Sequence, residues 1–194
     1  MRNITLILTI FVLFSCNNEE ENNSNFSYLP DAVGGYSTIN IIADQTLWDY
    51  GLKKHVEPIL TKEIEGLLNR ESEFDIQTVR SKAFNRLFQR QRFIVIFVSS
   101  NKVISEGVTV KKNVYANGQI IVEVSGKSEM NAIEVFNEKK AEIFTLLDNH
   151  RTFAIQQLAK AKNNHQLEEQ LLNSQGIKLT IPQSYTLALD TNNF

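Results

Sequence analysis

The stretch that most constrains the fold is Phe93-Ile94-Val95-Ile96-Phe97-Val98, a run of apolar and largely β-branched residues. A strand with one face in water alternates apolar and polar residues, whereas a strand that is apolar throughout is covered on both faces. Residues 93–98 therefore predict a central strand in a sheet that helices cover. The fold class that follows is α+β or α/β.

Weaker patterns predict the elements around this strand. Four stretches have the alternation or β-branched content of strands: residues 38–43, 74–79, 108–114 and 119–124. Asn117-Gly118, between the last two, is typical of a tight hairpin turn because both residues tolerate positive φ. Helical spacing covers residues 46–68, with Pro58 as a kink or a new start, and residues 83–89. Together these elements predict a mixed, largely antiparallel sheet.

A long helical pattern follows from residue 129 to residue 175, after Ser128 as its N-cap. Unbroken, this helix would be roughly 70 Å long at 1.5 Å per residue, which is too long for a compact domain of this size. Asn163-Asn164 is the expected break, and Gly176 is the expected C-terminal stop. We therefore expect one long hairpin-like helical segment, followed by strands at residues 177–181 and 185–189.

The only cysteine, Cys16, lies where an apolar run ends and a polar one begins. Residues 4–14 follow the basic Arg2 without a charge, and are too short to span a bilayer but long enough for the apolar core of a secretory signal. Leu13-Phe14-Ser15-Cys16 resembles a bacterial lipobox, whose cysteine is lipidated and becomes the first mature residue. Residues 1–15 are thus predicted to be a lipoprotein signal peptide, the alternative being an incidental cysteine near a leader.

The segment after Cys16 is predicted to be a flexible tether, assigned to residues 16–27. Residues 17–25 are all Asn, Glu or Ser and cannot bury enough apolar surface to order themselves. Glu19, Glu20 and Glu21 resemble the surface-export signal of Bacteroidota lipoproteins, and a plain soluble spacer is the alternative. The expected location is the cell envelope, as an outer membrane lipoprotein facing the periplasm or the cell surface, with the membrane contacted through the lipid.

A wider resemblance covers nearly the whole mature chain. It rests on these stretches: Leu29-Pro30-Asp31-Ala32-Val33-Gly34, Trp48, Glu71-Ser72-Glu73-Phe74-Asp75-Ile76, Ile181-Pro182-Gln183-Ser184-Tyr185 and Asn193-Phe194. Together they resemble a family of Bacteroidota lipoproteins known only as domain of unknown function 4837. That family brings no established catalytic residues. Its members continue past the equivalent of Phe194, so the resemblance implies that residues 28–194 form a single α+β domain that lacks a C-terminal portion.

Charge and motifs point to no cofactor, metal or catalytic residue. The chain has 20 Lys and Arg against 22 Asp and Glu, a balance that argues against a nucleic-acid partner. Gly126-Lys127-Ser128 lacks the glycine that a phosphate loop needs at position 121, and the histidines lack zinc-ligand spacing. The acids of residues 63–75 are interpreted as a solvated helix end, in preference to a carboxylate pair for glycoside hydrolysis.

One segment is locally basic, because no acid occurs between Asp75 and Glu106. Arg86 and Arg90 are four residues apart and should share a helix face. With Arg80 they could bind an anionic glycan, a phosphate-bearing head group or an acidic partner. The favoured alternative is a solvated face whose arginines pair with the acids of residues 63–75.

The first functional hypothesis is therefore a lipid-anchored, non-enzymatic binding or scaffold module with an unknown protein or glycan partner. The alternative is a cell-envelope hydrolase that acts on glycan or peptide, with a site that this chain does not reveal. A convergent acid pair or a Ser–His contact in a deep cleft would favour the enzyme. A shallow basic or aromatic face would favour binding.

Overall fold

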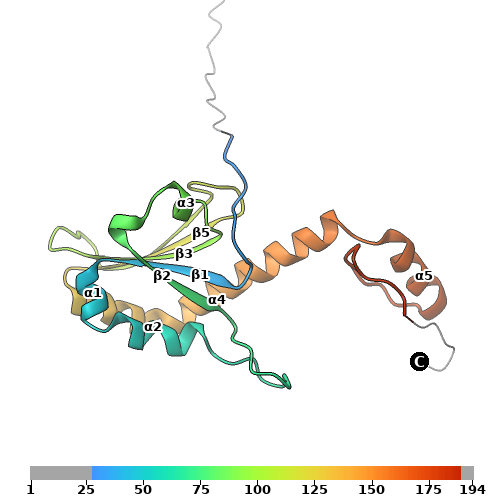
Figure 1. Ribbon diagram of the computed structural model, residues 1–194, viewed down its shortest axis with the longest axis horizontal. Coiled ribbons are helices and arrows are strands. Elements are labelled where there is room, and N and C mark those ends of the chain that lie inside the picture. The colour runs from blue at the N-terminus through green and yellow to red at the C-terminus, as the bar shows by residue number, and fades with distance from the viewer. Residues whose placement is uncertain (1–27, 189–194) are drawn as a thin grey trace, which may run out of the picture.

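A five-stranded sheet forms the centre of the computed structural model, which describes residues 28–188 (Figure 1). Its strands are β1 (Thr38–Ala43), β2 (Asp75–Arg80), β3 (Phe93–Ser99), β4 (Gly107–Lys112) and β5 (Ile120–Gly126). The order across the sheet is β2-β1-β3-β5-β4, which places the apolar β3 at the centre as predicted. β2, β1, β3 and β5 are parallel, and only β4 is antiparallel. The α+β class and the mixed sheet are confirmed, but a largely antiparallel sheet is wrong.

The connections explain the strand directions. A parallel neighbour requires a crossover of about a dozen residues or more. The chain provides one through α1 (Gln45–Asp49) and α2 (Leu52–Leu60), and another through a 3₁₀ turn (Ser81–Ala83) and α3 (Arg86–Gln89). β4 and β5 form the predicted hairpin, but a tight turn at Asn117-Gly118 is wrong, because residues 113–119 connect the strands and positive φ occurs at Asn113 and Gly118.

The two faces of the sheet are covered unequally (Figure 1). Beneath it, α1, α2 and α4 (Glu129–Ala161) build the main core, in which Ile41, Val95, Val122, Leu52 and Phe136 are among the fully buried side chains. Above it, a smaller layer around α3 packs the following residues together: Ile42, Val79, Phe84, Phe88, Ile94, Ile96 and Ile121. The upper face is therefore the thinner layer.

The first helical region is shorter than predicted. Gly51, with φ of 91°, separates α1 from α2, and Pro58 lies inside α2. The predicted apolar stripe does not continue, since Leu68 is fully exposed. After α2 the chain turns back at Gly66, and the Ile64 amide donates to the Glu71 carbonyl, a pairing that a continuing helix would not allow.

The long helix α4 has 33 residues and is about 50 Å long. Ser128 caps it, the chain breaks before α5 (His165–Gln175), and Gly176 ends α5 in the left-handed conformation, all as predicted. The predicted strands at 177–181 and 185–189 are wrong within the described residues, because the chain there folds back to form one isolated bridge, Asn163 with Pro182. None of the helices between residues 28 and 188 combines the length and apolar content that crossing a bilayer requires.

Candidate functional site

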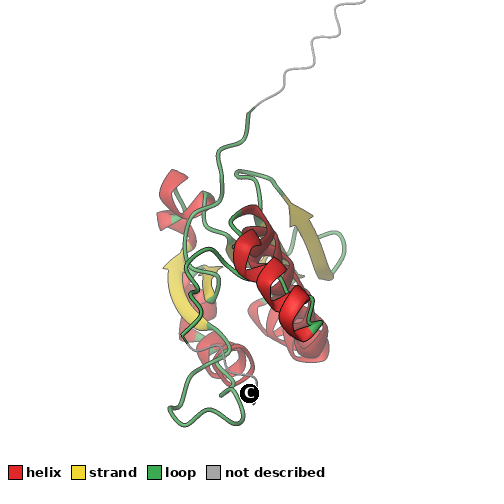
Figure 2. Ribbon diagram, turned by 90° about the vertical axis from the view of Figure 1, so that its right-hand side faces the viewer, coloured by secondary structure: helices red, strands yellow, loops and turns green. Residues whose placement is uncertain are grey.

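The C-terminal end of α4 leaves the sheet and carries a separate structure, here called the arm and defined as residues 148–188 (Figure 1). The buried residues of α4 end at Leu147, so the sheet supports only the first part of this helix. Figure 2 views the molecule from the side of the arm, with the helices in front of the yellow strands. His150 and Arg151 still contact the sheet domain, and beyond Arg151 the arm has to hold its shape mainly through its own contacts.

Polar side chains of the α4–α5 break bind the returning chain. The amide of Asn164 donates to the Ile181 carbonyl at 2.7 Å, and the Asn164 side chain donates to the Tyr185 carbonyl at 3.1 Å. The Glu168 carboxylate accepts from the Ile181 amide at 2.8 Å and from the Asn163 side chain at 2.9 Å. These contacts fix residues 181–185 against the start of α5.

Apolar packing contributes little to the arm. Within residues 148–188 the buried hydrophobic side chains are Leu167 and Ile181, each 8% exposed. The large hydrophobic side chains that are 40–62% exposed there are Phe153, Ile155, Leu158, Leu172, Ile177, Leu179, Tyr185 and Leu187. Where exposed apolar side chains form a contiguous patch, they mark interaction sites on protein surfaces.

Two neighbouring hollows are lined by apolar side chains of the arm. One, of about 530 Å³, lies between α4 and residues 182–184, and it is lined by Ile155, Leu158 and Ala159 of α4 and by Lys162, the C-cap of that helix. Their spacing of three or four residues places them on one helix face. The second, of about 450 Å³, lies between α5 and the returning chain and includes Leu171, Leu179, Tyr185 and Leu187. Pro182 lines both hollows, so the two adjoin at this residue.

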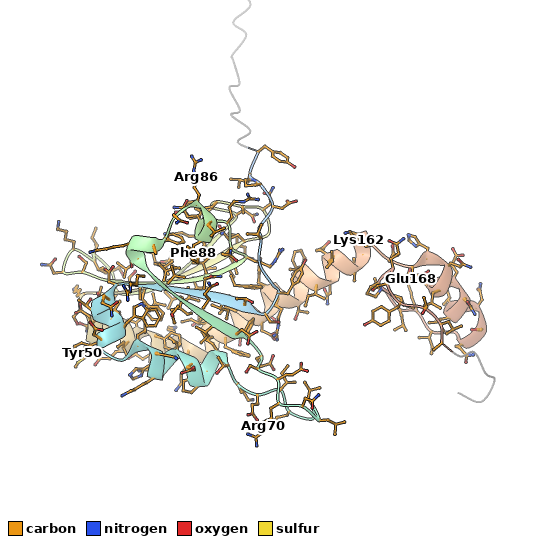
Figure 3. The ribbon with its side chains drawn as sticks, in the orientation of Figure 1. Tyr50, Arg70, Arg86, Phe88, Lys162 and Glu168 are labelled. Carbon is orange, nitrogen blue, oxygen red and sulfur yellow. The ribbon has the colours of Figure 1, made fainter. Side chains whose placement is uncertain are left out.

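The charges around this surface are mainly positive. Lys160, Lys162 and Lys178 have no ion pair among the described residues. Figure 3 labels Lys162 at the end of α4 and Glu168 on α5. The Glu168 carboxylate is used inside the arm, which leaves Glu169 as the exposed acid of the described part of the arm. The rim therefore favours an acidic partner.

Arg80, Arg86 and Arg90 were predicted to share one face, but they lie on opposite faces of the sheet. Arg80 lines a pocket on the face that α1 and α2 cover. Arg86 and Arg90 belong to the α3 region on the other face, where Arg86 points away from the domain (Figure 3). Arg90 donates to the Asp31 carbonyl at 3.3 Å. A common face for all three is therefore wrong.

The favoured alternative is half right: all three arginines are exposed, but their pairing with the acids of residues 63–75 is wrong. The nearby acids pair with other cations: Glu63 with Arg70 at 3.6 Å, Glu65 with Lys62 at 3.8 Å, and Glu73 with Arg151 at 2.7 Å. The partners of these acids lie on the same loop or on α4. The acids of residues 63–75 therefore do not pair with Arg80, Arg86 or Arg90.

The histidines make structural contacts within the described residues. His55 meets the Asn137 amide at 3.1 Å, and His150 donates through Nε2 to the Gly118 carbonyl at 3.2 Å. Burial lowers the pKa of His150, an effect that Lys112 and Arg92 reinforce and that the hydrogen bond to Gly118 opposes. Between residues 28 and 188 no three His, Cys, Asp or Glu side chains gather as metal ligands.

Two further sequence predictions concern the Gly126-Lys127-Ser128 turn and the N-terminal residues. In Gly126-Lys127-Ser128, the Lys127 amide donates to the Glu106 carboxylate at 2.8 Å, and the Ser128 side chain caps α4. This turn therefore forms the start of the helix. A Cβ on Gly126 would lie 2.2 Å from the Ala132 nitrogen, and this close approach requires glycine. Cys16 and Glu19, Glu20 and Glu21 lie outside the described residues.

The fold and the arm define a class: a mainly parallel α/β domain from which one long helix projects. The chain belongs to a family described as a domain of unknown function (DUF8532), which matches residues 32–160. The match covers the sheet and almost all of α4. It confirms that the chain contains a domain of unknown function, but the matching family is not family 4837, which the sequence resembles. No curated protein and no solved structure matches the chain.

Proposed function

We propose that this protein is a lipid-anchored binding module of the bacterial envelope, and that its arm binds an apolar, acidic segment of another protein. The observation that carries the proposal is the imbalance within the arm, where Leu167 and Ile181 are buried and eight large hydrophobic side chains are exposed. A partner would supply the apolar contacts that the arm lacks. Burial of that surface would contribute about 25 cal/mol per Å².

The chemistry of the partner follows from the rim. Lys162 lines the larger hollow beside Ile155 and Leu158, so a carboxylate next to an apolar anchor would meet its ammonium group. Lys160 and Lys178 add positive charge nearby. Exposed charge pairs of this kind are screened by salt. Binding should therefore weaken as ionic strength rises, while the apolar contacts persist.

The anchor and its location rest on the sequence. The lipobox-like stretch ending in Cys16 supports a lipoprotein, and the resemblance to Bacteroidota lipoproteins supports the outer membrane of that phylum. Several acyl chains on one cysteine would hold the protein to the membrane without a spanning helix. The acidic tether of residues 16–27 would leave the domain accessible to other envelope proteins.

A peptide-display selection against the full-length chain in detergent tests the arm. Peptides enriched on the wild type should combine large apolar residues with Asp or Glu. Leu158→Asp should weaken their binding by tenfold or more, and Lys162→Glu should weaken it less. Leu68→Asp is the matched control because Leu68 is fully exposed on the loop after α2, away from the arm, and it should bind as the wild type does.

Two outcomes would contradict this function. The first is a set of peptides that bind the wild type and Leu158→Asp equally. The second is self-association: if sedimentation shows a dimer for the wild type and a monomer for Leu158→Asp, a second copy of this chain occupies the arm.

A further inference from the structure

A second pocket lies far from the arm, at the carboxyl ends of β1 and β2. It has a volume of about 420 Å³ and is lined by Gln45, Trp48, Lys53, Thr78 and Arg80. Gln45 begins α1 directly after β1, and Arg80 is the last residue of β2. Open parallel sheets bind ligands outside the carboxyl ends of their strands. The pocket lies at this end of the sheet, beside β1 and β2, while the switch point in the strand order lies between β1 and β3.

The polar residues of β2 in this pocket are not explained by packing. Ile76, Thr78 and Arg80 alternate onto the same face of β2, the face turned toward the helices. Ile76 packs against the main core, whereas Thr78 and Arg80 are exposed. β2 is an edge strand, and α1 and α2 do not cover its carboxyl end. The hydroxyl and the guanidinium are thus presented to the pocket without a structural partner there.

The lining of the pocket has two positive side chains, Lys53 and Arg80, and no negative one, while the carboxylates of Asp49 and Glu57 lie beside it. Arg80 has no ion pair among residues 28–188. Lys53 lies 3.7 Å from Glu57, but both side chains are at least half exposed, and such pairs contribute little. The side-chain Nε2 of Gln45 donates to Asp49 Oδ1 at 2.8 Å, which leaves the side-chain Oε1 of Gln45 to accept from a ligand. A ligand with one anionic group and several hydroxyl groups fits these partners.

The apolar wall is Trp48, the only tryptophan of the chain. Its indole is partly buried, packs against the main core and lines the pocket. A rigid aromatic wall with a polar rim suits a ring whose faces are C–H groups and whose edge is hydroxylated.

We propose that this pocket binds a sugar ring that carries a carboxylate or a phosphate. The ring lies against Trp48, and the anionic group lies between Arg80 and Lys53. Arginine binds carboxylate and phosphate through paired N–H donors, which gives orientation as well as affinity. The Thr78 hydroxyl and the side-chain carbonyl oxygen of Gln45 form hydrogen bonds with the hydroxyl groups of the ring. This site is independent of the arm and of whatever the arm binds.

The fluorescence of Trp48 provides a direct test, because no other tryptophan contributes. The full-length chain in detergent is titrated with glucuronate, with glucose 6-phosphate and with glucose. At least one of the two anionic sugars should change the emission saturably, and glucose should bind at least tenfold more weakly. The comparison between glucuronate and glucose 6-phosphate shows whether the pocket prefers carboxylate or phosphate.

Two variants complete the experiment. Arg80→Gln should weaken binding of the anionic sugar about tenfold or more, since a charge-assisted contact is lost. Arg86→Gln is the matched control, because Arg86 is exposed on the opposite face, and it should bind as the wild type does. The proposal is overturned if neither anionic sugar gives a saturable change, if glucose binds equally well, or if Arg80→Gln, folded by circular dichroism, binds with wild-type affinity.

Discussion

The guanidinium of Arg151 lies 2.7 Å from the carboxylate of Glu73 and joins the long helix to the start of β2. Arg151 also donates to the Glu73 carbonyl and to Asp148, and its guanidinium lies 4.4 Å from the centre of the Phe74 ring. Its side chain is only 15% exposed. These contacts make Arg151 the polar centre of the junction between the sheet and the arm.

Arg151→Met should therefore destabilise the domain by about 1–3 kcal/mol, because it leaves the partly buried Glu73 without its partner. Arg70→Met is the matched control, since Arg70 is 87% exposed and lies 3.6 Å from Glu63, and its cost should stay below about 0.5 kcal/mol. The midpoint of urea unfolding measures both. Equal losses for the two variants would contradict the role of Arg151.

The partly buried imidazole of His150 predicts a pH dependence of stability. Because burial lowers its folded-state pKa below the ordinary 6.5, the unfolded chain takes up this proton at a higher pH than the folded one. The contribution of His150 is complete above about pH 6.5 and is lost as the pH falls through the folded-state pKa. His150→Gln keeps a donor for Gly118 without the charge, so its melting temperature should fall less than that of the wild type between pH 7.5 and pH 5. Identical losses would show that His150 does not titrate in this way.

Lipidation is expected at Cys16. Radiolabelled palmitate should enter the wild type and not Cys16→Ala, since the thiol is the only cysteine group that can carry the lipid. The label should follow the protein into the detergent-soluble membrane fraction. Equal labelling of both proteins would rule out this anchor.

Surface export is expected to depend on Glu19, Glu20 and Glu21. Replacing all three with alanine should keep the palmitate label but reduce digestion of the protein by protease added to intact cells. If digestion is unchanged, the three acids serve only as part of the spacer.

Local signals in the sequence predicted the elements that depend on local chemistry. The apolar run of β3, the positive φ of Gly118 in the β4–β5 hairpin, the Ser128 cap and the stop at Gly176 each act through neighbouring residues. Strand direction depends on the length of the crossovers and on which strands become neighbours, and residue patterns do not encode this directly. The mainly parallel sheet was therefore missed.

The candidate sites were harder to predict, because they combine residues that are distant in the sequence. The local sequence around Glu168 is typical of a solvated helix residue. In the structure its carboxylate accepts from the Ile181 amide, which is distant in the sequence. Arg80 was grouped with Arg86 by sequence proximity, although the alternation of β2 places it with Ile76 and Thr78. That two-residue period was the available signal, and it would have assigned Arg80 to the face toward the helices.

The unequal support of α4 means that one continuous helix contains two cooperative units. Its turns through Arg151, whose side chain contacts Glu73 and Phe74, can open only when the sheet domain opens, whereas the turns beyond Arg151 can open with the rest of the arm alone. A protein bound to the arm would raise the cost of that local opening and leave the global free energy of the sheet almost unchanged. Backbone amides along a single helix would then exchange with solvent at two separate rates, and occupancy of the arm would change only the faster one.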